Sequence, residues 1–250
     1  MILMYHNIGS DREFNTLPVP YFQEHIQYLK TSKYELVSLE EYVQNIQTGS
    51  KRGDLITLTF DDAYISICDI VLPLLKKEDI PFSIFVPVDY VGAHNKWDVE
   101  EGPGMSEIMT WEQLDHVAME NQVTIGSHGM SHTSFGKLDA TAIATELKDS
   151  RRILKEKLRT TVVYFAYPFG QLKDLGKGTE TTLNKLGYVA GLSTIWGKRN
   201  TIDDIYRLKR VEIEHIDDLA AFKKKLENST IYRQMKQSVK NSLFMMGLWE

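Results

Sequence analysis

Short apolar runs rich in β-branched residues alternate with amphipathic helical patterns along most of this 250-residue chain. When strands are apolar on both faces, this alternation is typical of a parallel sheet covered by helices. The sequences at 38–41 and 110–113 fit capping boxes and mark two helix starts. The strand candidates are 2–5, 35–37, 55–60, 82–86, 123–125, 162–165 and 189–192. Seven such units predict an α/β fold that is TIM-like, a barrel related to the eight-fold (β/α) type.

No linker or internal repeat divides the chain, so a single domain over residues 1–250 is predicted. Residues 88–109 form the longest connection without a regular pattern, and connections of this length are usually functional, so we expect it at the mouth of a site. A helical extension is predicted over residues 225–250. Its apolar positions either pack at the bottom of the barrel or dock on a membrane surface or a partner enzyme.

Charge and composition exclude several classes of function. A formal net charge of −5 argues against a phosphate-binding surface, so no nucleic-acid partner is expected. No run approaches the roughly 20 apolar residues that span a bilayer. The chain starts with a strand pattern rather than a basic signal-peptide region. The sequence as written therefore predicts a cytoplasmic protein, with membrane association through the tail as the alternative.

Chemically active residue types gather where the predicted strands end. In parallel α/β barrels the carboxyl ends of the strands meet at one rim, and the chemistry collects there. The candidates at this rim are His6, Asp61, Asp62, His128, Tyr167, Pro168, Phe169, Gly170, Thr194 and Trp196. His6 could bind substrate or only bond a neighbouring loop, and the aromatic residues could face sugar rings or belong to the core.

Asp62, His128 and His132 together match a catalytic zinc site, which takes three such ligands and leaves one position open. Cobalt, nickel or iron would also suit these ligands. Asp61 would remain beside the metal as a base. An isolated Asp62 would more simply cap the next helix, but two histidines at the same rim favour a ligand. Neighbouring residues of a strand point to opposite faces, so both aspartates serve one site only if the chain turns after residue 60.

These clusters resemble the motifs of the polysaccharide deacetylase family, the metal-dependent carbohydrate de-N-acetylases. Thr59-Phe60-Asp61-Asp62 looks like the first motif, in which the first Asp is the base and the second binds metal. Ser127-His128 through His132 is similar to the second, which supplies two imidazoles. The third, one wall of the substrate groove, resembles residues 165–170. The likeness extends from residue 2 to about 211 and implies a distorted seven-stranded barrel.

The chain also departs from the family pattern. Many members have Gly where this chain has Ala63, which predicts an unstrained backbone there. The Arg that orients the base in many members would fall at Ala166, and the fifth motif, Leu-x-x-His, is absent. Instead, residues 208–211 and the sequence Phe-Ala-Tyr-Pro resemble a subgroup that includes biofilm poly-N-acetylglucosamine deacetylases.

The resemblance implies hydrolysis of the N-acetyl group of an amino sugar, with acetate as a product and an N-acetylated sugar or polysaccharide as partner. The oxyanion would be stabilised by a backbone N–H of residues 167–170. The proton for the leaving nitrogen could come from Asp61, water, His6 or His215. The alternatives are a non-catalytic carbohydrate-binding barrel, a metal phosphoesterase and a two-carboxylate glycosidase.

Overall fold

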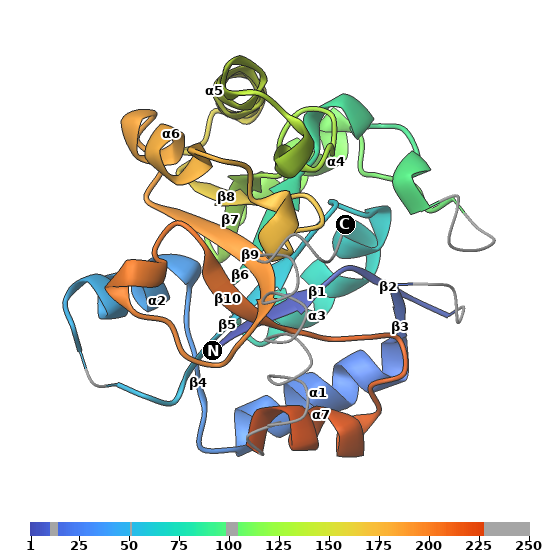
Figure 1. Cartoon of the computed structure of the whole chain (residues 1–250). Helices are drawn as coiled ribbons and strands as arrows, with labels where there is room; N and C mark the ends of the chain where they lie inside the picture. Colours follow the sequence, from blue (N-terminus) through green and yellow to red (C-terminus); the bar gives the residue numbers. More distant parts are fainter. Residues whose placement is uncertain (11–14, 51, 99–104, 228–250) are drawn as a thin grey trace.

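The computed structural model describes residues 1–10, 15–50, 52–98 and 105–227 (Figure 1). Seven strands form its centre: β1 (Ile2–Tyr5), β5 (Leu55–Phe60), β6 (Phe82–Val86), β7 (Val123–Ser127), β8 (Tyr164–Ala166), β9 (Ala190–Trp196) and β10 (Leu208–Glu212). Each pairs with its neighbours in parallel, and β1 closes the ring because it pairs with both β5 and β10. The predicted α/β barrel of seven strands is confirmed.

One of the predicted strands forms but lies outside the barrel ring. The run at 35–37 forms only the two-residue strand β4 (Glu35–Leu36), which pairs with the start of β5 outside the ring. The seventh barrel strand is β10, which the hydrophobic pattern did not reveal. Its sequence, Leu-Lys-Arg-Val-Glu, carries three charged residues, and one of them, Arg210, is fully buried. A buried charge breaks the pattern by which apolar strands are recognised.

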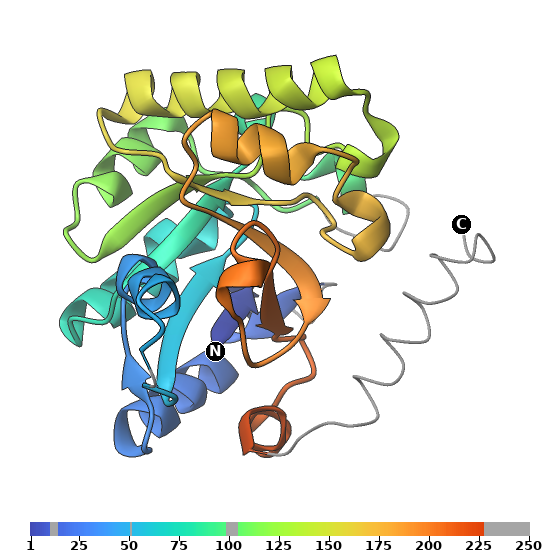
Figure 2. The same ribbon diagram turned by 60° about the vertical axis from the view of Figure 1, so that its left-hand side comes forward.

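Helices form the outer layer of the barrel (Figures 1 and 2). Their bounds are α1 (Val19–Thr31), α2 (Leu39–Gln47), α3 (Leu72–Lys77), α4 (Trp111–Ala118), α5 (Ala140–Leu158), α6 (Thr179–Lys185) and α7 (Leu219–Glu227). In Figure 2 the long α5 lies across the barrel beside α6, while α1 and α7 lie on the opposite side. Two short strands, β2 (Asn7–Gly9) and β3 (Thr16–Pro18), form a separate small sheet.

The two predicted capping boxes differ in the structure. Thr110 and Gln113 form the complete reciprocal pair at the start of α4. Ser38 accepts a hydrogen bond from the backbone N–H of Glu41, but the Glu41 carboxylate pairs with Arg52 instead of returning to the cap. The capping box predicted at 38–41 is therefore only half formed, because the Glu41 side chain, which would complete it, forms a surface ion pair with Arg52.

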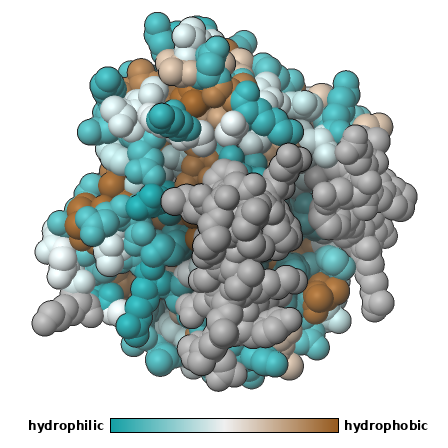
Figure 3. Space-filling view, viewed as in Figure 1, coloured by the Kyte–Doolittle hydropathy of each residue, from teal (hydrophilic) through white to brown (hydrophobic). Residues whose placement is uncertain are grey.

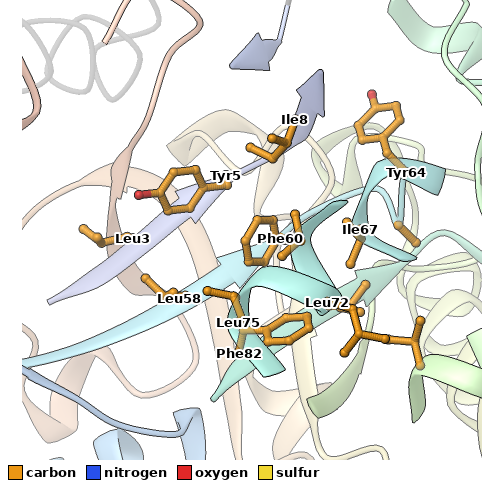
Figure 4. Packing of buried hydrophobic residues seen from close by; sticks show 14 of the residues in the cluster. Leu3, Tyr5, Ile8, Leu58, Phe60, Tyr64, Ile67, Leu72, Leu75 and Phe82 are labelled. Carbon is orange, nitrogen blue, oxygen red and sulfur yellow. The ribbon is translucent and has the colours of Figure 1, made fainter. Parts of the chain in front are cut away.

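Aromatic side chains pack the space between β1, β5, β6 and the helices (Figure 4). The rings of Tyr5 and Phe60 stack with centroids 5.3 Å apart, and Phe82 meets Phe60 edge to face at 5.6 Å. Burying a phenylalanine side chain contributes roughly 2 kcal/mol. All six residues of β5 are buried, so the strand is fixed on both faces where it delivers Asp61 to the rim.

Of the helical extension predicted over residues 225–250, the first three residues end α7, and residues 228–250 lie outside the described residues. The described segments contain no helix with the length and apolar character needed to cross a bilayer. On the face shown in Figure 3, apolar residues of the described part form small patches between hydrophilic ones. Docking through the tail stays a prediction.

A buried histidine joins α1 to α7. The His25 ring stacks on Phe222 with centroids 3.9 Å apart, and its Nε2 lies 2.9 Å from the carbonyl oxygen of Asp217. Burial lowers the pKa of His25 from 6.5 to about 4. The unfolded chain therefore binds more protons than the folded one between about pH 4 and 6.5, so stability falls as the pH drops through this window.

We expect the titration of His25 to lower the free energy of unfolding by about 2 kcal/mol when the pH falls from 7 to 4.5. The His25→Phe variant keeps the stacked ring and should lose less stability than wild type over this range. Denaturant unfolding at the two pH values measures the difference, with exposed His116→Gln as the control. If His25→Phe follows the wild-type pH dependence, His25 is not the group that titrates.

Candidate metal centre

Three side chains from two strand ends meet at the rim of the barrel. Oδ1 of Asp62, after β5, lies 3.4 Å from Nε2 of His128 and 3.2 Å from Nε2 of His132, which both follow β7. One possible ligand atom from each residue lies within 4.8 Å of the other two. All three side chains are buried. The structure therefore brings the three predicted ligands together.

The donor atoms of this cluster fit a divalent metal ion. Nδ1 of His128 lies 2.8 Å from the Ala166 carbonyl oxygen, which can only accept, so Nδ1 carries a proton and Nε2, which faces Asp62, is the ring atom that could bind a metal ion. Burial alone would raise the pKa of Asp62, but the two imidazoles hold it well below its usual range. A cation between these atoms would satisfy Oδ1 of Asp62, which is buried without a hydrogen bond among the described residues.

The turn that both aspartates require is present, and it is strained. Asp62 has φ 71° and Ala63 has φ 55°, so the chain leaves β5 through two left-handed residues. The expectation of an unstrained backbone at Ala63 is wrong, because a Cβ is disfavoured in this region. The geometry gives a physical reason why glycine suits this position.

We expect Ala63→Gly to raise the unfolding free energy by roughly 1 kcal/mol, since glycine adopts φ 55° without the steric penalty. Denaturant unfolding of metal-free protein measures the gain. Ala190→Gly, also buried but within β9, is the control and should lose roughly 1 kcal/mol. Equal losses in both variants would show that the left-handed turn stores no strain.

Asp61 is held by an arginine inside the barrel. Nη1 and Nη2 of Arg210 donate to the two carboxylate oxygens at 2.7 and 2.6 Å, and Nε donates to the Ser193 carbonyl at 2.8 Å. Burial would raise the pKa of Asp61, but the charge of Arg210 and its hydrogen bonds lower it. The carboxylate is therefore ionised and fixed in orientation. The family resemblance implied that an arginine at the position of Ala166 would orient the base. In this chain Arg210, from β10, makes that contact with Asp61.

A cavity of about 190 Å³ lies over Asp61 and the metal cluster. Three of the predicted substrate residues line it: His6, Phe169 and Thr194. The connection after β6 also reaches it, because the Trp97 ring stacks on His132 with centroids 3.9 Å apart. The prediction that residues 88–109 lie at the site mouth is confirmed for this described part.

Four predicted substrate residues take other positions. Tyr167 is buried, and its hydroxyl donates to the Tyr206 carbonyl at 2.9 Å. The Gly170 carbonyl accepts a hydrogen bond from the N–H of Thr194, so Gly170 is held against β9. Its neighbour Pro168 is buried. Trp196 lines a different cavity with Lys198 and Lys209. These four are not among the described residues that line the cavity over Asp61.

Sequence reasoning missed several residues of the site. Arg210 lies in the run that resembles the family subgroup, but its strand carries three charged residues, so no hydrophobic pattern indicated that it would be buried. Trp97 lies in a connection without a pattern, so nothing in its neighbourhood indicated that its ring would cover His132. The other cavity-lining residues outside the predictions are Met4, Asn15, Gln171 and Glu212.

Comparison with solved structures finds the same fold. The Streptococcus pyogenes deacetylase PplD, solved in complex with acetate, matches with a TM-score of 0.73 at 22% identity, over 91% of this chain and 97% of that one. IcaB from Ammonifex degensii matches with a TM-score of 0.70 at 22% identity, over 85% of this chain and 90% of that one.

Sequence comparison identifies the family. The chain is 26% identical to the Bacillus subtilis (strain 168) protein YxkH over 85% of its own length and 70% of that protein. It is also 26% identical to a Staphylococcus aureus poly-β-1,6-N-acetyl-D-glucosamine N-deacetylase, over 61% of this chain and about half (53%) of that enzyme. The profile of the polysaccharide deacetylase family matches residues 48–191, more than half of the chain. This chain belongs to the polysaccharide deacetylase family, a family of hydrolases.

Proposed function

We propose that this protein hydrolyses the N-acetyl group of an amino sugar in a polysaccharide or glycoconjugate and releases acetate. The observation that carries this proposal is the pairing of two features at one cavity. An ionised aspartate is fixed by Arg210, and an Asp-His-His metal cluster begins at the very next residue. The name of the S. aureus relative supports an N-acetylglucosamine polymer as the substrate.

The residues that would hold the metal are Asp62, His128 and His132, and zinc is the proposed ion. When bound, such an ion polarises a carbonyl group and lowers the pKa of a water molecule. The buried imidazole of His128 is fixed on one side, because its Nδ1 donates to the Ala166 carbonyl. Two histidines and one carboxylate leave a position open for substrate or water.

Asp61 acts as the base in this proposal. Its carboxylate keeps free lone pairs while Arg210 holds both oxygens, so it can accept the proton of the attacking water without rotating. The low pKa of Asp61 keeps the group ionised before the reaction. A fixed base adjacent to the metal cluster costs no reorganisation when the water attacks.

The oxyanion would be stabilised by the backbone N–H of Phe169. Pro168 has no N–H, the N–H of Tyr167 donates to the Leu192 carbonyl, and that of Gly170 donates to the Pro168 carbonyl. Within residues 167–170 this leaves Phe169, whose side chain lines the cavity. A backbone donor at this position is typical of an oxyanion hole.

His6 is the proposed proton donor to the leaving nitrogen, because it lines the cavity together with Asp61. We expect His6→Gln to lower the turnover number about a hundredfold while metal stays bound. His215→Gln should keep wild-type turnover, since His215 is not among the described residues lining this cavity. Steady-state acetate release measures both variants. A loss in His215→Gln but not in His6→Gln would reverse the assignment.

Acetate release tests the proposed function itself. Metal-reconstituted protein should release acetate from N-acetylglucosamine oligomers, and chelated protein should not. Metal binding without acetate release would favour a non-catalytic carbohydrate-binding barrel. Phosphate release from a phosphoester, or cleavage of the glycosidic bond, would favour the other two alternatives. The described residues supply one cluster of three ligands, whereas a two-metal phosphatase needs a second set.

A further inference from the structure

The short loop between the two metal-site histidines needs support from outside. Residues 129–131 connect His128 to His132, and both ends of this connection are left-handed: Gly129 has φ 79° and His132 has φ 52°. A left-handed backbone is sterically disfavoured for histidine, so this conformation persists only where surrounding contacts impose it. Those contacts decide where the two imidazoles point.

Glu146 of α5 supplies the largest group of such contacts. One carboxylate oxygen, Oε2, accepts from the backbone N–H of Met130 at 2.6 Å and of Ser131 at 3.2 Å. The other, Oε1, accepts from the Ser131 hydroxyl at 2.7 Å. Glu146 thus binds three donors of one loop, and hydrogen bonds to a charged acceptor are about twice as strong as neutral ones.

Ser150, one helical turn further along α5, contacts the residue that precedes His128. Its Oγ lies 2.7 Å from Oγ of Ser127, the residue before His128. Ser127 Oγ in turn accepts from the N–H of Gly129 at 3.1 Å. Residues four apart lie on one face of a helix, so Glu146 contacts the loop and Ser150 contacts the residue before His128 from the same side of α5. This pair is called the α5 clamp below.

The loop also accepts two backbone hydrogen bonds from the connection after β6. The N–H of Val88 donates to the Gly129 carbonyl at 3.2 Å, and the N–H of Asp89 donates to the Met130 carbonyl at 3.0 Å. The loop therefore donates to α5 and accepts from the connection after β6. Its tight fit is visible at Gly129, where a Cβ would lie 2.9 Å from Oε2 of Glu146.

We infer that Glu146 and Ser150 are positioning residues of the metal centre, which set the separation of the two imidazoles without touching the ion. This inference rests on the metal site of the proposed function. Its reason is geometric: the clamp binds the residues immediately before and between the histidines, so any movement of the loop relative to α5 changes both ligands. Outer contacts of this kind typically contribute 10–100-fold in metal affinity.

Metal titration of folded, metal-free protein tests the clamp. Glu146→Gln replaces one carboxylate oxygen with an NH₂ group that cannot accept the loop donors. We expect its Kd for Co²⁺ and Zn²⁺ to rise about 10–100-fold, with a changed visible absorption spectrum of the Co²⁺ form. Ser150→Ala should raise the Kd less. Glu156→Ala removes an exposed carboxylate that pairs with Arg152 on the same helix, and it should bind metal as wild type does.

The outcomes separate a positioning role from ordinary packing. A lower Tm of the metal-free variants with unchanged Kd and Co²⁺ spectrum would overturn the inference. If Glu146→Gln does not fold, Ser150→Ala decides by the same two readouts. The failure of the proposed function is a different result: wild-type protein that binds metal but releases no acetate leaves the clamp intact.

Discussion

Asp61→Asn should lower the rate of acetate release by about a hundredfold or more, the usual scale for removing a positioned base, while bound metal stays at the wild-type level. Asparagine cannot accept the proton from water, but its side-chain oxygen can still accept one bond from Arg210. The three proposed ligands remain untouched. Elemental analysis together with steady-state kinetics measures both quantities.

Asp62→Asn is the matched control, because it changes the neighbouring aspartate in the same way. It should lose metal affinity as well as turnover, since it weakens one of only three protein ligands. Equal loss of metal in both variants would show that the assignment of base and ligand is wrong. Retention of more than a tenth of the activity in Asp61→Asn would remove Asp61 from the role of base.

Arg210→Met should reduce the unfolding free energy by about 3–5 kcal/mol, because it leaves the buried Asp61 carboxylate without its cation. Both partners of this pair are almost completely buried, so solvent cannot replace the lost interaction. Turnover should also fall, since the base is no longer held in place. Denaturant unfolding of metal-free protein gives the stability change.

The double variant Asp61→Asn/Arg210→Met is the decisive comparison for the pair. It removes both charges, so it should be more stable than Arg210→Met alone, and the cycle should give a coupling of a few kcal/mol. If the double variant is no more stable than the single one, the cost of Arg210→Met comes from lost packing rather than from an unpaired charge.

The barrel and the Asp-His-His cluster could be predicted because the strands, and the residues that follow them, are recognisable in short stretches of sequence. Alternating apolar runs indicate strands, and strand ends converge on one rim whichever residues they carry. That rule was enough to place Asp62 with His128 and His132. Arg210 illustrates the limit of the rule. Its buried guanidinium pairs with Asp61, which lies 149 positions away in the sequence, and no local pattern indicates such a pairing.

Backbone conformation and side-chain direction escaped prediction for related reasons. The left-handed turn at Ala63 is imposed by the structure around it, against the preference of the residue. Trp196 was expected at the rim, but it lines another cavity together with Met1 and Asp54, which precede β1 and β5. A register irregularity in the β9–β10 pairing precedes the Trp196–Arg210 pair, and no local pattern indicates it. Trp97 reaches His132 through a long irregular connection whose path depends on tertiary contacts.

The position of Arg210 on the closing strand links catalytic competence to completion of the barrel. The residues of the metal cluster are all present by position 132, whereas the partner of the base arrives only with β10 and lies outside the segment 48–191 that matches the family profile. A chain ending before β10 would keep every metal ligand but leave Asp61 unrestrained in an open sheet. Synthesis from the N-terminus therefore delivers the three residues of the proposed metal site early and the partner of Asp61, the proposed base, last.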